Sequence, residues 1–271
     1  MTIITGGPGS MIYEALNKLL CDKKEGVLFS LFSPSHLIYL VLFAVILTAL
    51  IFLLKGKSRE FKDKVTKILI GIGFGLYMLD FFLMPFAYGE IQIEKLPFHI
   101  CTLSCTLSFL SRNVEWMKKY RTHMAMLAFI ANFSFLAVPA GVMWYQVTPS
   151  SYRAIQTLVF HLVVSLYGLI MLIFDNDEFS WKFIYRDMIT VASIVVWSMI
   201  GSYSYTGNVG GYNYYFNWFF VKQDPFNIFP ANLAPYIMPV FIIVAFFAVE
   251  SLIYGAVYLG KRYLVKNGEN E

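Results

Sequence analysis

Seven stretches of mostly apolar residues, separated by polar linkers, run along the chain between residues 36 and 259. A helix needs about 20 apolar residues to cross the hydrocarbon core of a bilayer. The pattern therefore predicts an all-α fold, a polytopic membrane bundle of about seven transmembrane helices. These helices are expected at residues 36–54, 66–88, 96–111, 123–141, 153–174, 185–205 and 233–259. The third is short and has Pro97 in its first turn, where the missing N–H costs nothing.

The chain before the first apolar stretch has a helical pattern of its own. Between Met11 and Leu20 the apolar residues recur on one helical face, with polar residues between them. We interpret this pattern as an interfacial amphipathic helix lying on the membrane, with a soluble packing helix as the alternative. No cleavable signal peptide is expected, because the first long apolar run starts near His36 and is long enough to span.

Lys and Arg residues are distributed unequally over the linkers. Seven spans place 15 of them on one side of the membrane and 6 on the other. Cytoplasmic loops carry the excess of positive charge. The N-terminus is therefore expected outside and the C-terminus in the cytoplasm. We divide the chain into an extracytoplasmic N-terminal segment (1–34), a transmembrane domain (35–260) and a cytoplasmic tail (261–271).

The linker between the last two spans, residues 206–232, is long and aromatic. Its aromatic residues include Tyr212, Tyr214, Tyr215, Phe216, Trp218, Phe219 and Phe220. A loop of this length and composition is not expected to extend freely into water. We expect it to fold back onto the outer membrane face as a lid or a re-entrant segment.

Composition supports a membrane protein and excludes several other classes. Hydrophobic residues make up 58% of the chain and charged residues only 14%, which is too apolar for an ordinary soluble domain. The net charge of +4 is explained by topology, so no nucleic-acid partner is expected. Three cysteines form no disulfide framework. No zinc-type ligand spacing, phosphate loop or dinucleotide fingerprint is present, so we expect neither a metal nor a cofactor.

A few polar side chains fall inside the predicted spans, where they are costly and usually mark function. They are Asp80, His99, Cys101, Asn132, Gln156, His161 and Glu250. Asp80, Asn132 and His161 lie about 12 to 14 Å below the outer ends of their spans. Cys101 lies about 8 Å and His99 about 5 Å below the start of the third span. We therefore predict one polar pocket that opens outward beneath the aromatic loop. Glu250 lies deeper, toward the cytoplasm, and is assigned no partner.

This set of residues could carry out acyl transfer through a thioester. A thiol nucleophile needs a base within hydrogen-bond reach, and the base needs an acceptor that orients it. Cys101 would be the nucleophile and His161 the base, with Asp80 or Asn132 as the orienting group. His99 is two residues from Cys101 and points to a different helix face, so it would contact a headgroup or an oxyanion instead.

Each of these residues also has a structural interpretation. A cysteine in a transmembrane helix is often a small apolar filler, as we expect for Cys105. His161 could simply hydrogen-bond a neighbouring helix. Asp80 must be paired or protonated, and it could coordinate an ion or relay a proton instead. His36 and His123 lie at span ends and are expected to be interfacial.

Several motifs resemble a known family. Leu96-Pro97-Phe98-His99-Ile100-Cys101-Thr102-Leu103-Ser104 resembles the Leu-Pro-x-His-x-Cys-x-x-Ser motif of the YwaF-type bacterial integral membrane family. The stretch from Pro149 to Arg153, followed by His161, resembles the family's fifth span. Tyr212-Asn213-Tyr214-Tyr215-Phe216, followed by Asp224-Pro225, resembles its external aromatic segment. The resemblance covers roughly residues 36–255.

The resemblance implies an activity that the residues alone do not establish. Animal relatives of the family, the transmembrane-164 acyltransferases, move fatty acyl chains between phospholipids with a Cys and a His, which correspond to Cys101 and His161. Membrane lipids are then the expected partners, with His99, Asn213, Tyr214 and Arg153 as substrate contacts. More distant androgen-induced-gene hydrolases use Thr and His. This sequence departs from the family pattern at Thr102, where an acidic residue is frequent, and at Leu162, where glycine is expected.

Three hypotheses for function follow. The first is an outward-facing lipid acyltransferase or ester hydrolase. The second is a transporter of small solutes or ions that uses Asp80, His99 and His161 as a coupled site. The third is a non-catalytic membrane scaffold.

Overall fold

The computed structural model describes residues 14–16, 20, 27–88, 95–144, 147–175, 181–209, 212–224 and 227–268. Seven helices of 14 residues or more fall in these ranges. They are α2 (Pro34–Leu54), α3 (Arg59–Tyr88), α4 (Ile100–Asn113), α5 (Arg121–Ala137), α7 (Tyr152–Phe174), α8 (Ile184–Ser204) and α9 (Ala234–Gly268). Shorter elements connect them, namely η2 (Glu115–Tyr120), α6 (Ala140–Trp144), η3 (Trp181–Phe183), β1 (Thr206–Val209), β2 (Tyr212–Tyr215) and η4 (Trp218–Phe220).

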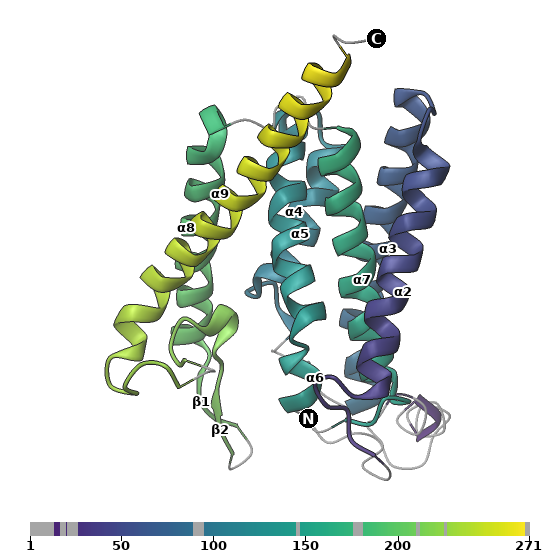
Figure 1. Cartoon of the computed structure of the whole chain (residues 1–271). Helices are drawn as coiled ribbons and strands as arrows, with labels where there is room; N and C mark the ends of the chain where they lie inside the picture. The colour runs from purple at the N-terminus through teal and green to yellow at the C-terminus, as the bar shows by residue number, and fades with distance from the viewer. Residues whose placement is uncertain are drawn as a thin grey trace.

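The seven helices lie side by side and alternate in direction, as Figure 1 shows. We call the end where α2, α4, α7 and α9 begin the hairpin end, because β1 and β2 lie there, and the other end the C-terminal end. The all-α bundle and its seven long helices agree with the sequence prediction. In the described part of the chain, six helices are long and apolar enough to cross a membrane.

The third predicted span is shorter than expected. Helix α4 has 14 residues and begins at Ile100, whereas the prediction began at residue 96. It starts late because His99 has an extended backbone, with φ −78° and ψ 141°, and serves as the N-cap residue. At about 1.5 Å per residue, α4 is only about 21 Å long, so it does not meet the length of a full span.

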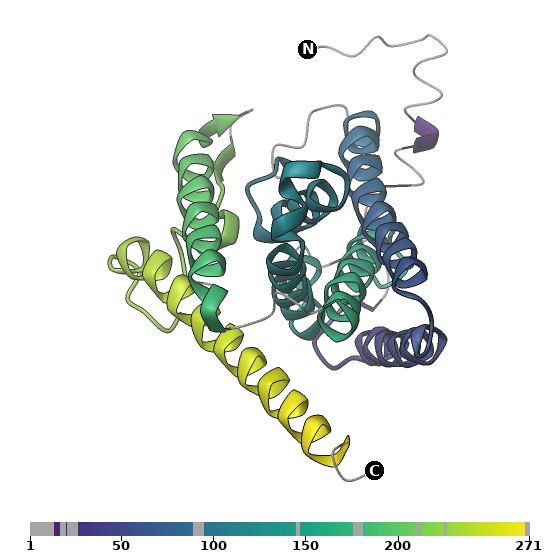
Figure 2. The same ribbon diagram turned by 90° about the horizontal axis from the view of Figure 1, so that it is seen from above.

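The core of the bundle is formed by α3, α4, α5 and α7, with α2 on one side and the pair α8 and α9 on the other (Figure 2). A central cluster of buried side chains joins the four core helices: Ile70, Tyr77, Cys105, Ala125, Ala128, Phe160, Val164, Tyr167 and Met171. A second cluster, which includes Ile100, Leu127, Val195 and Met238, joins α4 and α5 to α8 and α9. Helix α9, which contains Pro239, crosses the other helices obliquely.

The aromatic linker folds back onto the bundle, as predicted, and it begins with a short hairpin. Strands β1 and β2 pair antiparallel, with Thr206 opposite Tyr215. The chain then returns to the helices at η4, where the side chains of Trp218 and Phe219 are buried, with 1% and 7% exposed. The hairpin is therefore a small addition to the predicted all-α fold.

The two histidines at span ends, which were expected to be interfacial, are buried by other parts of the protein. The His36 ring donates through Nε2 to the Leu136 carbonyl oxygen at 2.8 Å, and its Nδ1 accepts from the Phe32 N–H at 3.0 Å. His123 is 2% exposed and hydrogen-bonds Asp187. Each ring has a hydrogen-bond partner remote in sequence, Leu136 for His36 and Asp187 for His123. The position of a residue along a span does not reveal such a partner.

Two terminal predictions are only partly covered by the structure. Of the predicted amphipathic helix, residues 14–16 are helical and Leu20 packs against Leu16, Leu83 and Tyr152. The remainder of that helix lies outside the described residues. At the other terminus, α9 continues to Gly268, so most of the segment 261–271 extends the last helix.

The tightest helix contact is between α5 and α7 at Gly168. A methyl group added there would lie 2.5 Å from the Ala125 carbonyl oxygen and 2.7 Å from Phe129 Cβ. Small residues that let two backbones approach are typical of membrane helix interfaces, where the hydrophobic effect does not drive association. The sequence comparison expected a close-packing glycine next to His161, but the close approach occurs two turns further along.

Gly168→Ala is expected to destabilise the protein by about 1 to 3 kcal/mol, because the backbones must move apart to admit the methyl group. Thermal unfolding of the purified protein in detergent measures this loss. Gly75→Ala in α3 is the matched control, since nothing lies within 4 Å of the place that its methyl group would take, and it should be neutral or slightly stabilising. Equal melting temperatures for the two variants would contradict the assigned contact.

Candidate active site at the start of α4

The segment before α4 is held in place by α8. The Trp197 indole Nε1 donates to the Pro97 carbonyl oxygen at 2.8 Å, and the Ser198 hydroxyl donates to the Phe98 carbonyl oxygen. The Phe98 ring lies against Gly201, where a methyl group would come within 2.4 Å of the ring. This glycine lets the ring contact the α8 backbone, so the position at which α4 begins is fixed by packing as well as by hydrogen bonds.

Cys101 is the second residue of α4 and a free, partly buried thiol. The first N–H groups of a helix have no intrahelical partner. In α4 the side chain of the N-cap residue, His99, does not accept a hydrogen bond from them. Together with the helix dipole, these groups stabilise negative charge that develops on the sulfur or on a nearby oxygen. In the structure the thiol donates to the Ala131 carbonyl oxygen in α5, at an Sγ–O distance of 3.7 Å.

A contact among three helices relates Cys101 to His161. A methyl group on Gly73 of α3 would lie 2.7 Å from Val164 of α7 and 3.6 Å from the Cys105 sulfur of α4. Cys105 and Val164 therefore lie at the same level in the bundle. Helices α4 and α7 both begin at the hairpin end, so Cys101 and His161 are each about one turn closer to that end.

The start of α4 is recessed within the bundle. Along α7, Val164 is about 18 Å from the first residue, Tyr152. Along α4, Cys105 is only about 8 Å from Ile100. The first turn of α4 thus lies about 10 Å deeper than the start of α7.

His161 is oriented by the backbone of its own helix. Its ring is 6% exposed, and Nδ1 lies 2.7 Å from the Thr157 carbonyl oxygen. A carbonyl oxygen only accepts, so Nδ1 carries the proton and Nε2 has the free lone pair of a base. The ring stacks on Phe135 of α5, with a centroid distance of 3.8 Å and an interplanar angle of 15°.

Helix α5 connects the two side chains. Cys101 bonds to Ala131 and His161 stacks on Phe135, and these α5 residues are four apart on one helix face. The rise between them is about 6 Å. The thiol and the imidazole therefore contact adjacent turns of the same α5 face. The Gly73 contact likewise places Cys101 and His161 in the same part of the bundle.

The orienting roles assigned to Asp80 and Asn132 require correction. Asp80 is 4% exposed and forms an ion pair with Lys95, with Oδ2 and Nζ 2.6 Å apart. Asn132 donates to the Ser104 hydroxyl at 3.2 Å and to the Ala128 carbonyl oxygen. The hydrogen bond at Nδ1 of His161 is made by the Thr157 backbone instead. Asn132 joins α5 to α4, since Ser104 in turn donates to the Cys101 carbonyl oxygen.

Lys95 is a site residue that the sequence did not indicate, because it lies just outside a predicted span. Its backbone oxygen accepts from the Tyr77 hydroxyl at 3.0 Å, so α3 holds both ends of the residue. Lys95 and His99 are both close enough to His161 to interact with its ring electrostatically. A cation thus lies beside the predicted residues Asp80 and His161.

His99 contacts the aromatic segment, as the lid prediction required. Its Nδ1 accepts from the Phe219 N–H at 3.4 Å. Phe219 and Phe220 have positive φ angles of 56° and 57°, a backbone conformation that is unfavourable for bulky residues. Hydrogen bonds from the Trp218 N–H and Lys222 Nζ to Ser202 hold this turn against α8. Burial lowers the pKa of Lys222.

The remaining predicted contacts lie at the same end of the bundle. Arg153 is in the first turn of α7 and is partly exposed. Asn213 and Tyr214 lie in β2, opposite Asn208 and Gly207, and their side chains are outside the described residues. In the described chain, no group of three His, Cys, Asp or Glu side chains could hold a metal ion.

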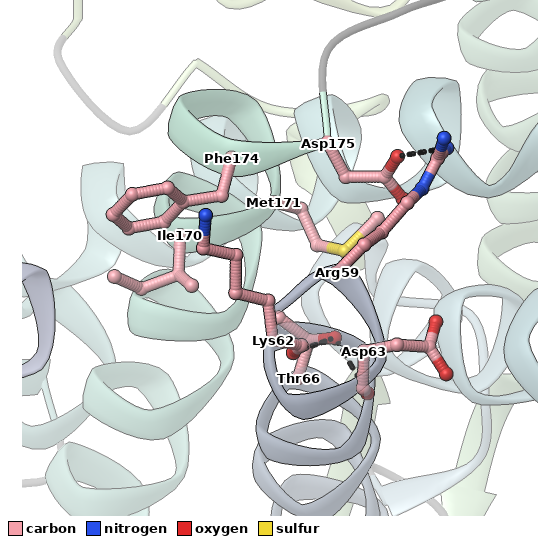
Figure 3. A pocket seen from close by; sticks show the side chains of 8 residues that line it. All are labelled: Arg59, Lys62, Asp63, Thr66, Ile170, Met171, Phe174 and Asp175. Atoms are coloured by element: carbon pink, nitrogen blue, oxygen red, sulfur yellow. Dashed lines mark hydrogen bonds and ion pairs between the residues drawn. The ribbon is translucent and has the colours of Figure 1, made fainter. Parts of the chain in front are cut away.

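Two cavities in the described structure lie away from Cys101 and His161. Figure 3 shows one at the C-terminal end, of about 20 Å³, where Arg59 reaches Asp175 above Asp63 and Thr66. Asp175 also pairs with Arg121, and Asp63 pairs with Arg112. This volume admits about one water molecule, so the cavity is part of an ion-pair network that joins α3, α4, α5 and α7. A larger one, of about 350 Å³, lies at the hairpin end beside Pro34 and Pro149.

Breaking the Asp80–Lys95 pair is expected to destabilise the protein, because it leaves a buried charge uncompensated. Asp80→Asn and Lys95→Met should each lower the unfolding free energy by about 3 to 5 kcal/mol, and the double variant by clearly less than their sum. Chemical unfolding in detergent micelles measures the cycle. The exposed pair Glu115–Lys118 is the control and should show little coupling. Additive losses for Asp80 and Lys95 would refute the pair.

Comparison with known proteins identifies the family. The TMEM164 family profile matches residues 31–255, which include all seven helices up to the middle of α9. No curated protein and no solved structure gives a match. The match spans more than half of the chain and contains both Cys101 and His161. The chain is a multi-pass membrane protein that belongs to the TMEM164 family.

Proposed function

We propose that this protein is a thiol-dependent lipid acyltransferase, with Cys101 as the nucleophile and His161 as the base. The observation that carries the proposal is that the two side chains contact adjacent turns of one α5 face, Cys101 at Ala131 and His161 at Phe135. Membership of the TMEM164 family supports it, as does the resemblance of the Leu96–Ser104 motif to the YwaF-type bacterial proteins and their acyltransferase relatives.

The proposed reaction has two steps. The Cys101 sulfur attacks the carbonyl carbon of a lipid ester while His161 Nε2 takes the thiol proton, and the N–H groups of the first α4 turn hold the oxyanion. The carbon–oxygen bond then breaks, and the leaving alcohol takes the proton from His161. In the second step an acceptor hydroxyl gives its proton to His161 and attacks the thioester. The carbon–sulfur bond then breaks, and His161 returns the proton to the Cys101 thiolate. Water as the acceptor would make the same site a hydrolase.

Residue positions suggest how a lipid would be held. His99 is proposed to contact the headgroup or the oxyanion from its place at the α4 N-cap. Arg153, Asn213 and Tyr214 lie at the same end of the bundle and are proposed as further headgroup contacts. Asp80 would act indirectly, by positioning Lys95, and Asn132 by anchoring the start of α4 through Ser104.

The distribution of charge suggests the side on which the reaction takes place. Basic residues at the ends of α3, α4 and α5, among them Arg59, Arg112 and Arg121, lie at the C-terminal end. By the positive-inside rule we propose that this end faces the cytoplasm. The thiol would then meet lipids of the outer leaflet.

A transporter that uses Asp80, His99 and His161 is less well supported. Lys95 already neutralises Asp80, and the Nδ1 proton of His161 is committed to the helix backbone.

Trapping the acyl intermediate tests the proposal. The purified protein is incubated in vesicles with a phospholipid that carries an alkyne-tagged acyl chain. Wild-type protein should retain the tag on Cys101, and neutral hydroxylamine should release it because the bond is a thioester. Cys101→Ala should retain no tag. His161→Asn should slow labelling by about 10² to 10⁴, the usual contribution of a general base.

Cys105→Ala is the matched control, because Cys105 lies one turn further along the same helix and is fully buried. It should label like the wild type. Tag that persists on Cys101→Ala, or that hydroxylamine does not release, would show that Cys101 is not the acylated nucleophile. Retained folding of each variant is checked by gel filtration and thermal unfolding.

A further inference from the structure

A second polar cluster lies between α5, α8 and α9, in the half of the bundle toward the C-terminal end. It contains His123, Asp187, Glu250 and Tyr254, which are 2%, 3%, 0% and 2% exposed. His123 is about 12 Å along α5 from Ala131, so the cluster is separate from the thiol–imidazole site. Ionisable groups buried at membrane depth are costly and usually functional.

Asp187 is the centre of this cluster. One carboxylate oxygen lies 2.9 Å from His123 Nδ1, and the other accepts from the Tyr254 hydroxyl at 2.7 Å. Two donors from two helices thus satisfy the carboxylate in its ionised form. The other ring nitrogen of His123, Nε2, is buried and has no hydrogen-bond partner among the described residues.

Glu250 faces this cluster without a hydrogen bond. Both of its carboxyl oxygens are buried and have no partner in the described chain. The residue is four positions before Tyr254, on the same face of α9. It lies close enough to Asp187 and Tyr254 to interact with both electrostatically.

The groups around Glu250 do not compensate a negative charge. The buried side chains that cluster with Tyr254, one turn along α9, are apolar: Met126, Ile130 and Leu172. Helix α8 contributes Asp187, a like charge, and Arg186, whose guanidinium lies over the Phe183 ring at 4.5 Å. Helix α5 contributes His123, which is bonded to Asp187. Asp175 at the end of α7 is held by arginines. An ionised Glu250 would therefore be a buried charge with no donor.

We propose that Glu250 is a proton-binding site: its carboxyl is protonated at neutral pH and exchanges this proton with the C-terminal face through Tyr254, Asp187 and His123. The ligand is a proton, because the described residues contain no group of three acidic, His or Cys side chains that could hold a metal ion. Along this path each group accepts one proton and passes another on, so the net change is loss of the Glu250 carboxyl O–H bond and release of one proton at the C-terminal face. Loss of the proton places a second negative charge beside Asp187, which favours separation of α9 from α5 and α8.

Infrared difference spectroscopy of the full-length protein in lipid nanodiscs tests the proposal. At neutral pH, wild type minus Glu250→Gln should show the carbonyl stretch of a protonated carboxyl. The band should disappear when the pH is raised and Glu250 ionises. Glu115→Gln is the control, because that side chain is 86% exposed and pairs with Lys118, so its difference spectrum should show only carboxylate bands. Carboxylate bands alone for Glu250→Gln would overturn the proposal.

Two further variants test the exchange path. Asp187→Asn removes the like charge, so the carbonyl band of Glu250 should disappear about one pH unit lower or more. Tyr254→Phe removes the nearest hydroxyl and should slow the shift of this band on transfer to D₂O by about tenfold. An unchanged titration in the first variant would remove Asp187 from the site. An unchanged rate in the second would remove Tyr254 from the path.

Discussion

The backbones of α5 and α7 touch at Gly168, and the place of His161 beside α5 depends on this contact. Lipid tails are as apolar as the helix surfaces, so the two helices associate through close packing. The contact sets the register of the pair, and that register brings His161 onto Phe135 two turns away. Cys101 then reaches Ala131 on the next turn of α5. Displacement of α5 along α7 by one residue would rotate Phe135 away from the imidazole.

The sequence predicted the number and order of the helices, since runs of apolar residues report membrane crossings directly. It also brought Cys101 and His161 to a similar depth. It could not predict the partner of Asp80, because Lys95 lies in a linker and the pairing depends on how that linker folds. The burial of His36 depends on Leu136, 100 residues away. The Thr157 carbonyl was within reach of sequence reasoning, since it lies one helical turn before His161.

Polar groups in this bundle are satisfied in three different ways. At the C-terminal end, aspartates are surrounded by arginines, and Asp175 receives contacts from Arg59, Arg112 and Arg121. Near the hairpin end, Asp80 and Lys95 form a single pair. Glu250 has neither a cation nor a donor, which distinguishes it from the other buried carboxylates of the described chain. Ion pairing thus compensates the buried charges of Asp175 and Asp80. On our proposal, Glu250 instead avoids the cost by carrying a proton and no charge.

The recessed start of α4 has a consequence for the surrounding bilayer. A helix of about 21 Å leaves roughly a third of a 30 Å hydrocarbon core without a helical wall at this point. Non-helical backbone at such depth is tolerated only where protein covers it. Here the side chains of Trp197 and Ser198 donate hydrogen bonds to the backbone carbonyl oxygens before α4. A bilayer that meets this gap must thin locally or send a lipid downward to fill it. The mismatch in length would thereby bring glycerol ester bonds to the level of the sulfur without any moving part.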